Sequence, residues 1–420
     1  MKQPVLGGPA ARTLVMEMAR HPGPTAGLVV GADAGDAVLT AAVDALLPED
    51  TLTVVSPHPD AVSAQLTALG DWVASRVRVV GSVTEVDPAD VVVLAEPLTG
   101  SAEAARTTLD GLAKLLKPGG VLAVAVPALL PTGGVGAAAE LDRQSALYGA
   151  GSDLILRNLP PVRVHRLRWT PGDPALAERM LPVTRPSSIP LTRDLHLDSH
   201  GVAAAGITAG LAVLARLTRP RSKLWLLLAG ATVPVAAFFR DPQRESPEDP
   251  TLVVAASDGK VLSVERVSDD RFSEDGRTEE YVRIAVFLSV LDVHINRAPV
   301  AGRVVDYFLE DGGFAAAMTD RGEHNASAYT VLATVHGRVA VAQRTGMIAR
   351  RIVQRAPVGS LLARGERFGL IRFGSRTDVY LPADAVEPLV GPSDRVVGGV
   401  TPLARWRTTD SSGPETSPGS

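Results

Sequence analysis

Cysteine is absent from the 420 residues, and aromatic residues make up only 4% of them. The lack of cysteine excludes disulfides, thiolate nucleophiles and cysteine-ligated metals, and we predict no metal site. A formal charge of −4 gives no electrostatic basis for binding nucleic acid in general. The first residues lack the charged-then-apolar pattern of a signal peptide, so we expect the bulk of the protein to stay in the cytoplasm.

Apolar residues, by contrast, make up 45% of the chain, enough for two or three packed domains. In the first 180 residues, short apolar runs alternate with segments that have helical length and spacing. The runs lie at 27–30, 51–55, 76–80, 90–94 and 121–126. This alternation predicts an open, mostly parallel α/β sheet with helices on both faces.

The stretch LLKPGG at 115–120, with ADVVVL upstream at 89–94, resembles class I methyltransferases that bind S-adenosylmethionine. Their cofactor loop needs glycines for close backbone approach, but Asp33 stands at the middle position here. The expected acids before this loop and after the second strand are also missing. We therefore favour a retained fold without chemistry. The alternative is an active methyltransferase, for which Asp33, Asp36 and Glu96 are the residues to examine.

A proline-rich linker is predicted at 181–200, followed by two apolar stretches at 202–217 and 224–239. Both stretches are shorter than the roughly 20 residues of a spanning helix, so a buried core hairpin is one interpretation. They contain almost no polar residue on any face, however, and basic residues flank them. We favour a helical hairpin at 201–240 that associates with an anionic membrane surface.

From about residue 250, alternating apolar positions and turn residues predict a mainly antiparallel β domain. Within it, FGSR at 373–376 separates two short apolar runs, and by itself Gly374-Ser375 is typical of a tight turn.

Four further segments change that interpretation: FFRDPQR at 238–244, SDGKV at 257–261, FLSVLDVHINRAPVAGRV at 287–304 and GMIARRI at 346–352. Together with FGSR, and in this order, they resemble the short form of the phosphatidylserine decarboxylase proenzymes over residues 190 to 405. The resemblance implies self-cleavage between Gly374 and Ser375, which leaves Ser375 as an N-terminal pyruvoyl group. It also implies conversion of phosphatidylserine to phosphatidylethanolamine through a Schiff base with that group, the two cleaved chains staying associated.

The same resemblance assigns His294 as the base for the Ser375 hydroxyl and Asp258 as the group that orients or polarises it. Taken alone, each has a structural explanation: a histidine at a strand end and an Asp-Gly turn. Longer relatives carry a second histidine where this chain has Arg297. Arginines suit the phosphate of the substrate, and we predict substrate contacts for Arg297, Arg350 and Arg376.

The predicted organisation is therefore a methyltransferase-like domain (1–180), linker (181–200), membrane hairpin (201–240), decarboxylase domain (241–406) and disordered tail (407–420). We expect the protein on the cytoplasmic face of the cell membrane, either alone or as a homo-oligomer. Two alternatives remain at this point: a bifunctional decarboxylase and methyltransferase that binds S-adenosylmethionine, and a non-catalytic membrane scaffold.

Overall fold

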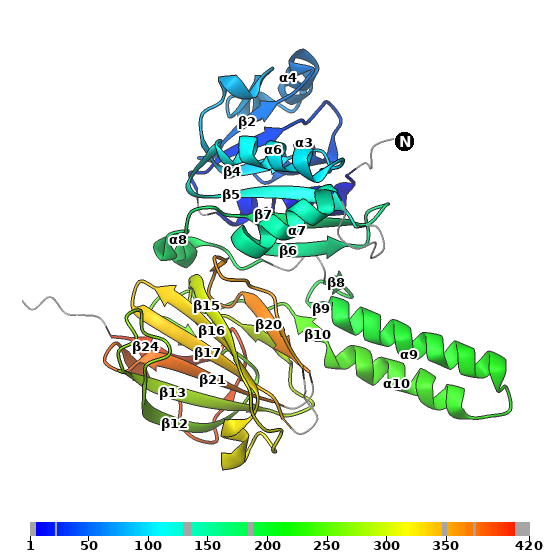
Figure 1. Cartoon of the computed structure of the whole chain (residues 1–420). Coiled ribbons are helices and arrows are strands. Elements are labelled where there is room, and N and C mark those ends of the chain that lie inside the picture. Colours follow the sequence, from blue (N-terminus) through cyan, green and yellow to red (C-terminus); the bar gives the residue numbers. More distant parts are fainter. Residues whose placement is uncertain are drawn as a thin grey trace, which may run out of the picture.

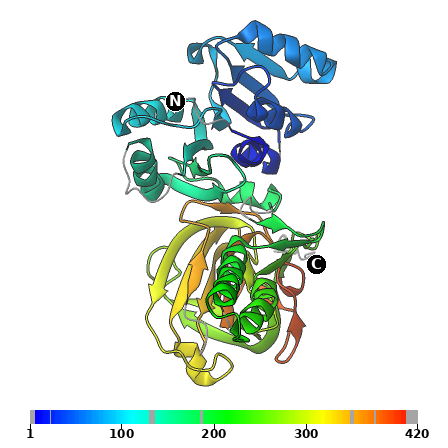
Figure 2. The same ribbon diagram turned by 90° about the vertical axis from the view of Figure 1, so that its right-hand side faces the viewer.

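The computed structural model describes residues 6–21, 23–128, 136–183, 188–346, 351–372 and 375–407. An N-terminal α/β domain is stacked on a C-terminal β domain, and two long helices project sideways from their junction (Figure 1). Figure 2 shows the two helices nearly end-on, in front of the β domain. Apart from Arg407, the tail predicted to be disordered (407–420) lies outside the described residues.

The N-terminal domain is built on a seven-stranded sheet of order β3-β2-β1-β4-β5-β7-β6. The first five strands are parallel, and β7 is antiparallel to both of its neighbours. The strands are β1 (Ala26–Val30), β2 (Thr51–Val55), β3 (Val77–Val80), β4 (Ala89–Leu94), β5 (Leu116–Pro127), β6 (Gly149–Ile155) and β7 (Val162–Leu167). The methyltransferase-like, doubly wound sheet predicted from the sequence is therefore present.

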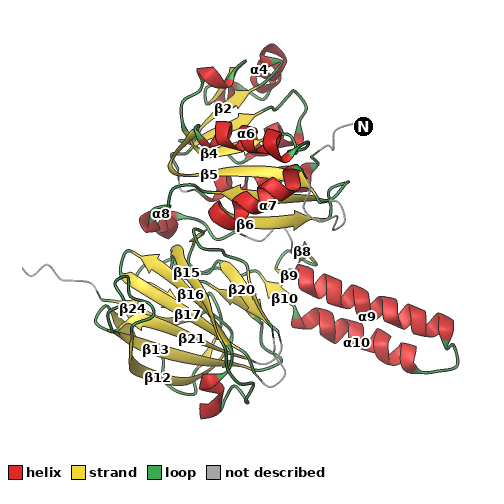
Figure 3. Ribbon diagram, in the orientation of Figure 1, coloured by secondary structure: helices red, strands yellow, loops and turns green. Residues whose placement is uncertain are grey.

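Helices cover both faces of this sheet because its central strands are apolar on both sides (Figure 3). One face packs against α1 (Gly8–Leu14), α3 (Ala37–Asp44), α4 (Pro59–Ala68) and α5 (Asp71–Ala74). The other packs against α6 (Ala102–Ala113) and α7 (Ala137–Tyr148). The short helices α2 (Met16–Arg20) and η1 (Val83–Glu85) complete the domain.

The described part of the segment predicted as a linker contains regular secondary structure. Just before it, α8 (Pro174–Arg179) packs against the β domain through Ala177. Within it, β8 (Ile189–Pro190) and β9 (Leu195–Leu197) form a small sheet with β10 (Arg240–Pro242). This sheet closes the base of the helical hairpin, because β9 and β10 lead directly into and out of it.

The hairpin consists of α9 (Ser199–Thr218) and α10 (Leu224–Phe238). The side chain of Asp198 caps α9 by accepting from the His200 amide over 2.9 Å. The α9 helix has a mean hydropathy of 1.6, yet only 11% of its apolar window is buried. By length and composition α9 is able to cross a membrane, whereas α10 is shorter.

The C-terminal domain contains an eight-stranded sheet of order β19-β15-β16-β17-β21-β13-β12-β23, antiparallel throughout. Two three-stranded sheets, β14-β20-β18 and β11-β24-β22, accompany it. The first strands are β11 (Leu252–Val254), β12 (Gly259–Asp269), β13 (Glu279–Leu288), β14 (Ile295–Arg297), β15 (Gly302–Glu310), β16 (Ser327–Thr334) and β17 (Gly337–Arg344). The rest are β18 (Ile352–Gln354), β19 (Leu361–Leu362), β20 (Arg367–Ile371), β21 (Ser375–Pro382), β22 (Val386–Pro388), β23 (Arg395–Val396) and β24 (Pro402–Trp406), and η2 (Asp320–His324) precedes β16. This is the predicted antiparallel β domain.

The two faces of the large sheet pack differently, which decides where each site residue lies. Val341 and Val379 belong to the main core of the domain, under the smaller sheets, and we call this the inner face. Tyr329 and Tyr380 form a separate aromatic cluster around Phe272 on the opposite side, the outer face. Because side chains alternate along a strand, neighbouring residues of β21 lie on opposite faces.

Candidate active site

Ser375 is the first residue of β21, which lies between β13 and β17 near the centre of the large sheet. It is opposite Leu288 of β13, and its exposed fraction is 0%. Together with Thr377 and Val379 it belongs to the inner face. Ser375 Oγ has no hydrogen-bond partner among the described residues, so the hydroxyl is buried and unpaired. Gly374, the other half of the predicted cleavage site, lies outside the described residues.

His294 directly precedes β14 and is 2% exposed. Its Nδ1 donates to the Asp292 carbonyl over 2.9 Å, so the proton-accepting lone pair of the neutral ring is on Nε2. Burial lowers the pKa of His294 to about 4, which keeps the ring neutral near pH 7. The His294 carbonyl accepts from the Ile371 amide over 3.2 Å. His294 therefore lies at the end of β20, from which the chain leads into Ser375.

Asp258 is fixed by a two-point ion pair with Arg244, over 2.6 and 2.8 Å. It also accepts from the Gly398 amide over 2.9 Å. Its negative charge raises the pKa of His294, opposing the larger effect of burial. The His294 ring contacts the Asp292 carbonyl, and the charge of Asp258 contributes to the electrostatics of the ring.

The neighbours of Asp258 connect it to the strand of Ser375. The Ser257 hydroxyl lies 2.6 Å from the Thr377 hydroxyl, two residues along β21 from Ser375. Gly259 has a φ of 150°, and a Cβ there would lie 2.1 Å from the Phe287 carbonyl oxygen. Only glycine allows this approach to β13. Residues 257–259 therefore pack directly against the two strands that meet at Ser375.

Two of the three predicted substrate arginines are buried in ion pairs. Arg297 is 2% exposed; its Nη2 lies 3.2 Å from Asp241 and donates to the Pro242 carbonyl over 2.8 Å. Burial lowers the pKa of Arg297 to about 9. Because its guanidinium is committed to the FFRDPQR segment, this placement favours a structural role over a substrate contact.

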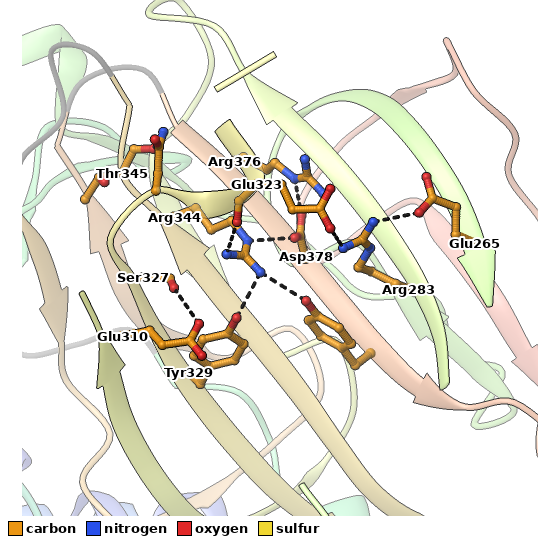
Figure 4. Close-up of polar contacts among 12 residues, drawn as sticks. Glu265, Arg283, Glu310, Glu323, Ser327, Tyr329, Arg344, Thr345, Arg376 and Asp378 are labelled. Carbon is orange, nitrogen blue, oxygen red and sulfur yellow. Dashed lines mark hydrogen bonds and ion pairs between the residues drawn. The ribbon is translucent and has the colours of Figure 1, made fainter. Parts of the chain in front are cut away.

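Arg376 extends from the outer face, away from Ser375. Its Nε donates to Asp378 over 2.5 Å, and Arg344 holds the same carboxylate over 2.8 Å. Figure 4 shows both arginines directed at Asp378, with Tyr329 beside Arg344. The predicted substrate contact of Arg376 therefore does not share a face with Ser375, because the two residues are sequence neighbours on one strand. Arg350, the third predicted arginine, lies outside the described residues.

The motif pattern missed two buried carboxamides at the inner face. Asn296 belongs to the DVHINR segment at 292–297, between His294 and Arg297. Gln343 follows Val339 and Val341 at the inward-facing positions of β17. A polar residue at such a position indicates a buried polar site, and the sequence alone shows it. Gln343 Nε2 donates to Asn296 Oδ1 over 2.6 Å.

In the N-terminal domain, the loop after β1 satisfies its own backbone. The Asp33 amide donates to Asp36 over 2.6 Å, and the Gly35 amide donates to Gln65 over 2.7 Å. Asp33 also accepts from His58 Nδ1 over 2.8 Å. Two of the amides that a cofactor loop would offer to a ligand are thus used within the protein. Glu96 is exposed near Gly31.

Comparison with solved structures gives only distant similarity for this half. The O-methyltransferase TomG from Streptomyces achromogenes is 15% identical, covers 38% of this chain and 79% of its own, and has a TM-score of 0.28. The precorrin-6y C5,15-methyltransferase from Geobacter metallireducens GS-15 is 16% identical, covers 40% of this chain and 92% of its own, and has a TM-score of 0.29.

The C-terminal half has close relatives. The family described as phosphatidylserine decarboxylase matches residues 233–404. The phosphatidylserine decarboxylase proenzyme of Symbiobacterium thermophilum is 49% identical over 202 residues, which are 48% of this chain and 91% of the relative. Those of Geotalea uraniireducens and Gluconobacter oxydans are 43% and 45% identical, with 48% of this chain matched in each case and 91% and 89% of the relatives. This chain belongs to the phosphatidylserine decarboxylase family.

Proposed function

We propose that this protein decarboxylates phosphatidylserine to phosphatidylethanolamine with a pyruvoyl group that it makes from Ser375. The observation that carries the proposal is the Ser375 hydroxyl, which is buried at the start of a central strand and has no hydrogen-bond partner among the described residues. A buried hydroxyl without a hydrogen bond lowers the stability of the fold. A serine that cleaves its own chain, however, needs a hydroxyl that is free to attack. The residues around Ser375 fit a pyruvoyl group at this position. Ser375 lies on the inner face, and β20 leads from His294 toward Ser375.

His294 serves as the base. The Nδ1 proton of His294 is donated to the Asp292 carbonyl in a hydrogen bond, so Nε2 is the atom that accepts the proton of the Ser375 hydroxyl. Oγ attacks the carbonyl carbon of residue 374, and the peptide bond becomes an ester. Loss of the Ser375 α-proton then expels the upstream carboxylate, splits the chain and leaves a dehydroalanine. This enamine tautomerises to an imine, and water hydrolyses the imine to the pyruvoyl carbonyl with release of ammonia. The pyruvoyl group supplies the electron sink that the substrate needs when it loses carbon dioxide.

The two pieces stay associated after the split. The C-terminal piece begins at residue 375 and supplies β21, which pairs along its whole length with β13 and over five residues with β17. It also supplies β22 and β24, whose Trp406 and Leu403 belong to the main core. Removing this piece would expose the centre of the sheet, so the ladders and the core hold the two chains together.

The hairpin of α9 and α10 anchors the enzyme at the cytoplasmic face of the cell membrane. Its apolar side chains are exposed, among them Leu214 (55%) and Leu227 (71%). Basic residues at its tip, Arg219, Arg221 and Lys223, suit anionic headgroups. At its base, Phe238 packs on the His294 ring with centroids 4.2 Å apart. A lipid-embedded hairpin would therefore bring the site to the surface where the substrate lies.

For the N-terminal domain we propose a scaffold role. The internal bonding of the loop at 31–36 supports it, and so do the contacts with the decarboxylase domain. Buried Arg20 pairs with Glu366, and the Ser360 hydroxyl donates to the Ala150 carbonyl over 2.9 Å. Binding of S-adenosylmethionine to the full chain, measured by calorimetry, would overturn this assignment.

Replacing Ser375 with alanine tests the decarboxylase proposal. Wild-type protein should give two masses, the smaller beginning at the former Ser375, and the S375A chain should give one mass without decarboxylase activity. Ser273→Ala is the matched control: its hydroxyl bonds the Asp270 carbonyl at the domain edge, and this variant should split normally. An uncut S375A protein with full activity would refute the proposal.

A further inference from the structure

Two carboxamides that the proposed mechanism does not use join the inner face of the large sheet to the small sheet β14-β20-β18: Gln343 of β17 and Asn296 of β14. Asn296 and Gln343 are both 0% exposed and share one hydrogen bond. A single hydrogen bond between two carboxamides uses the NH2 group of one and the oxygen of the other. The remaining NH2 group and the remaining oxygen still need partners. In the described part of the chain, Asn296 Nδ2 and Gln343 Oε1 have no partner. Buried polar atoms are nearly always paired, so these two atoms are available to a further partner.

Strand register brings the pair close to Ser375. Gln343 of β17 is directly opposite Thr377 of β21, and Thr377 shares a face with Ser375. Diagonal neighbours across an antiparallel pair are about 7–8 Å apart, within reach of a long side chain. Ser375 and Gln343 therefore lie on the inner face of the large sheet, and the bond from Gln343 brings Asn296 of β14 next to that face.

A glycine makes room for the pair. In the ladder of β14 and β20, Asn296 is opposite Gly369. A Cβ at Gly369 would lie 3.0 Å from Gln343 Nε2 and 2.7 Å from the Val353 carbonyl, so β20 can lie over the amides only without a side chain there. His294 lies two residues from Asn296 beside the same ladder. The proposed base and the unpaired amide donor are thus held by one short pair of strands.

We propose that Asn296 Nδ2 donates a hydrogen bond to the oxyanion formed during self-cleavage, an inference that rests on the proposed function. In that step, the Ser375 hydroxyl gives its proton to the base and Oγ bonds to the carbonyl carbon of residue 374. The π electrons of the carbonyl move onto its oxygen, where the negative charge develops. When the charge collapses, the bond to the Ser375 nitrogen breaks and that nitrogen takes up the proton.

The chemistry of the site suits this role. The amide is neutral, buried and held by Gln343 before the reaction begins. A donor placed in advance in a buried site stabilises a developing charge with little reorganisation. The Gln343 bond uses Asn296 Oδ1, which leaves the donor end of the amide for the reacting oxygen.

The experiment times chain splitting in the purified proenzyme by intact mass. Asn296→Asp keeps the shape and the acceptor of the Gln343 bond but removes the unpaired donor, and Asn296→Ala removes the whole amide. Each should slow splitting about 10²–10³-fold, the usual effect of losing one oxyanion donor. Hydroxylamine cleaves esters, so it should not rescue either variant, because both are blocked before the ester forms.

Asn325→Asp is the matched control, a buried asparagine of the same domain whose amide donates to the Ala315 and Thr345 carbonyls. It should lower the thermal midpoint at least as much as N296D without slowing splitting to that extent. Splitting at the wild-type rate in folded N296D or N296A, or rapid splitting of either in hydroxylamine, would overturn the inference. If S375A also splits, the proposed function itself fails; if S375A stays whole while N296D splits normally, only the role of Asn296 fails.

Discussion

At the scale of single residues, the site depends on polar groups that are buried without full pairing. Ser375, Asn296 and Gln343 each leave a polar atom unpaired within the described part of the chain. Each such atom costs about 1–3 kcal/mol in an apolar interior. The charge of Asp258, by contrast, is paired with Arg244. The domain is thus less stable at its reacting centre than a conventional sheet would be.

The pKa of His294 gives a prediction about pH. Because burial lowers it to about 4, the ring stays neutral and able to accept a proton from pH 8 down to about 5. The splitting rate should be flat over that range and fall about tenfold per pH unit below 4. Phe238→Ala would admit water to the ring and bring the pKa toward its ordinary 6.5, with Asp292, Arg240 and Asp258 still facing it. The fall should then begin near pH 6.

The pH dependence of protein stability gives an independent measure of the pKa of His294. Between pH 6.5 and 4 the unfolded chain binds a proton at His294 that the folded chain does not. The free energy of unfolding should therefore decrease as the pH falls through that window, and it should decrease less in F238A. Identical rate profiles and identical stability profiles in the two proteins would show that Phe238 does not shield the ring.

At the scale of elements, the hairpin and the site are one connected unit. Helix α9 is about 30 Å long at 1.5 Å per residue, comparable to the apolar thickness of a bilayer. The end of α10 belongs to a small core formed by Phe238, Phe239, Ile295 and Leu370. Through this core the helices of the hairpin touch β14 and β20, the two strands that position His294 and Asn296.

Exposed leucines of the hairpin are predicted to bind lipid. Leu214→Glu together with Leu227→Glu should reduce flotation with vesicles of anionic phospholipid by at least about tenfold. Burying each leucine contributes about 1.5–3 kcal/mol, and a charge in its place opposes insertion. Leu156→Glu with Leu159→Glu is the control, because these leucines of the N-terminal domain are 66% and 92% exposed. Equal flotation of both double variants would exclude the hairpin as the anchor.

At the scale of the whole molecule, a buried network of charges joins the two domains. Arg20 pairs with Glu17 over 3.2 Å and with Glu366 of the decarboxylase domain, all three buried. It also donates to the Leu361 carbonyl over 3.2 Å. Ala177 and Met180 pack on Leu361 next to these charges. The interface combines an apolar patch with a desolvated ion pair, so the domains should unfold together.

Arg20→Met should destabilise the full chain, because Glu366 would stay buried with one of its partners lost. The expected decrease in the free energy of unfolding is about 3–5 kcal/mol, the usual cost of breaking a buried pair from one side. Urea denaturation in detergent measures it, with exposed Arg12→Met as the control. A decrease equal to that of R12M would mean that the network does not hold the domains together.

The sequence alone determined the features that depend on local pattern. Alternation of apolar residues predicted both domains, hydropathy predicted the hairpin, and the ordered motifs identified the family through Ser375 and His294. The roles of His294 and Asp258 stay predictions. Such features are visible because a strand, a helix or a motif is a property of neighbouring residues.

Only the tertiary structure decided which residues share a site. In the structure, the side chains of Arg376 and Ser375 lie on opposite faces of the sheet. Arg297 forms an ion pair with Asp241, and Asn296 is hydrogen-bonded to Gln343. Alternation assigns a side chain to a face of its strand, but it does not say what covers that face. Contacts between distant strands follow from how the sheets stack, and burial then decides whether an arginine is free to bind a phosphate or is consumed in an ion pair.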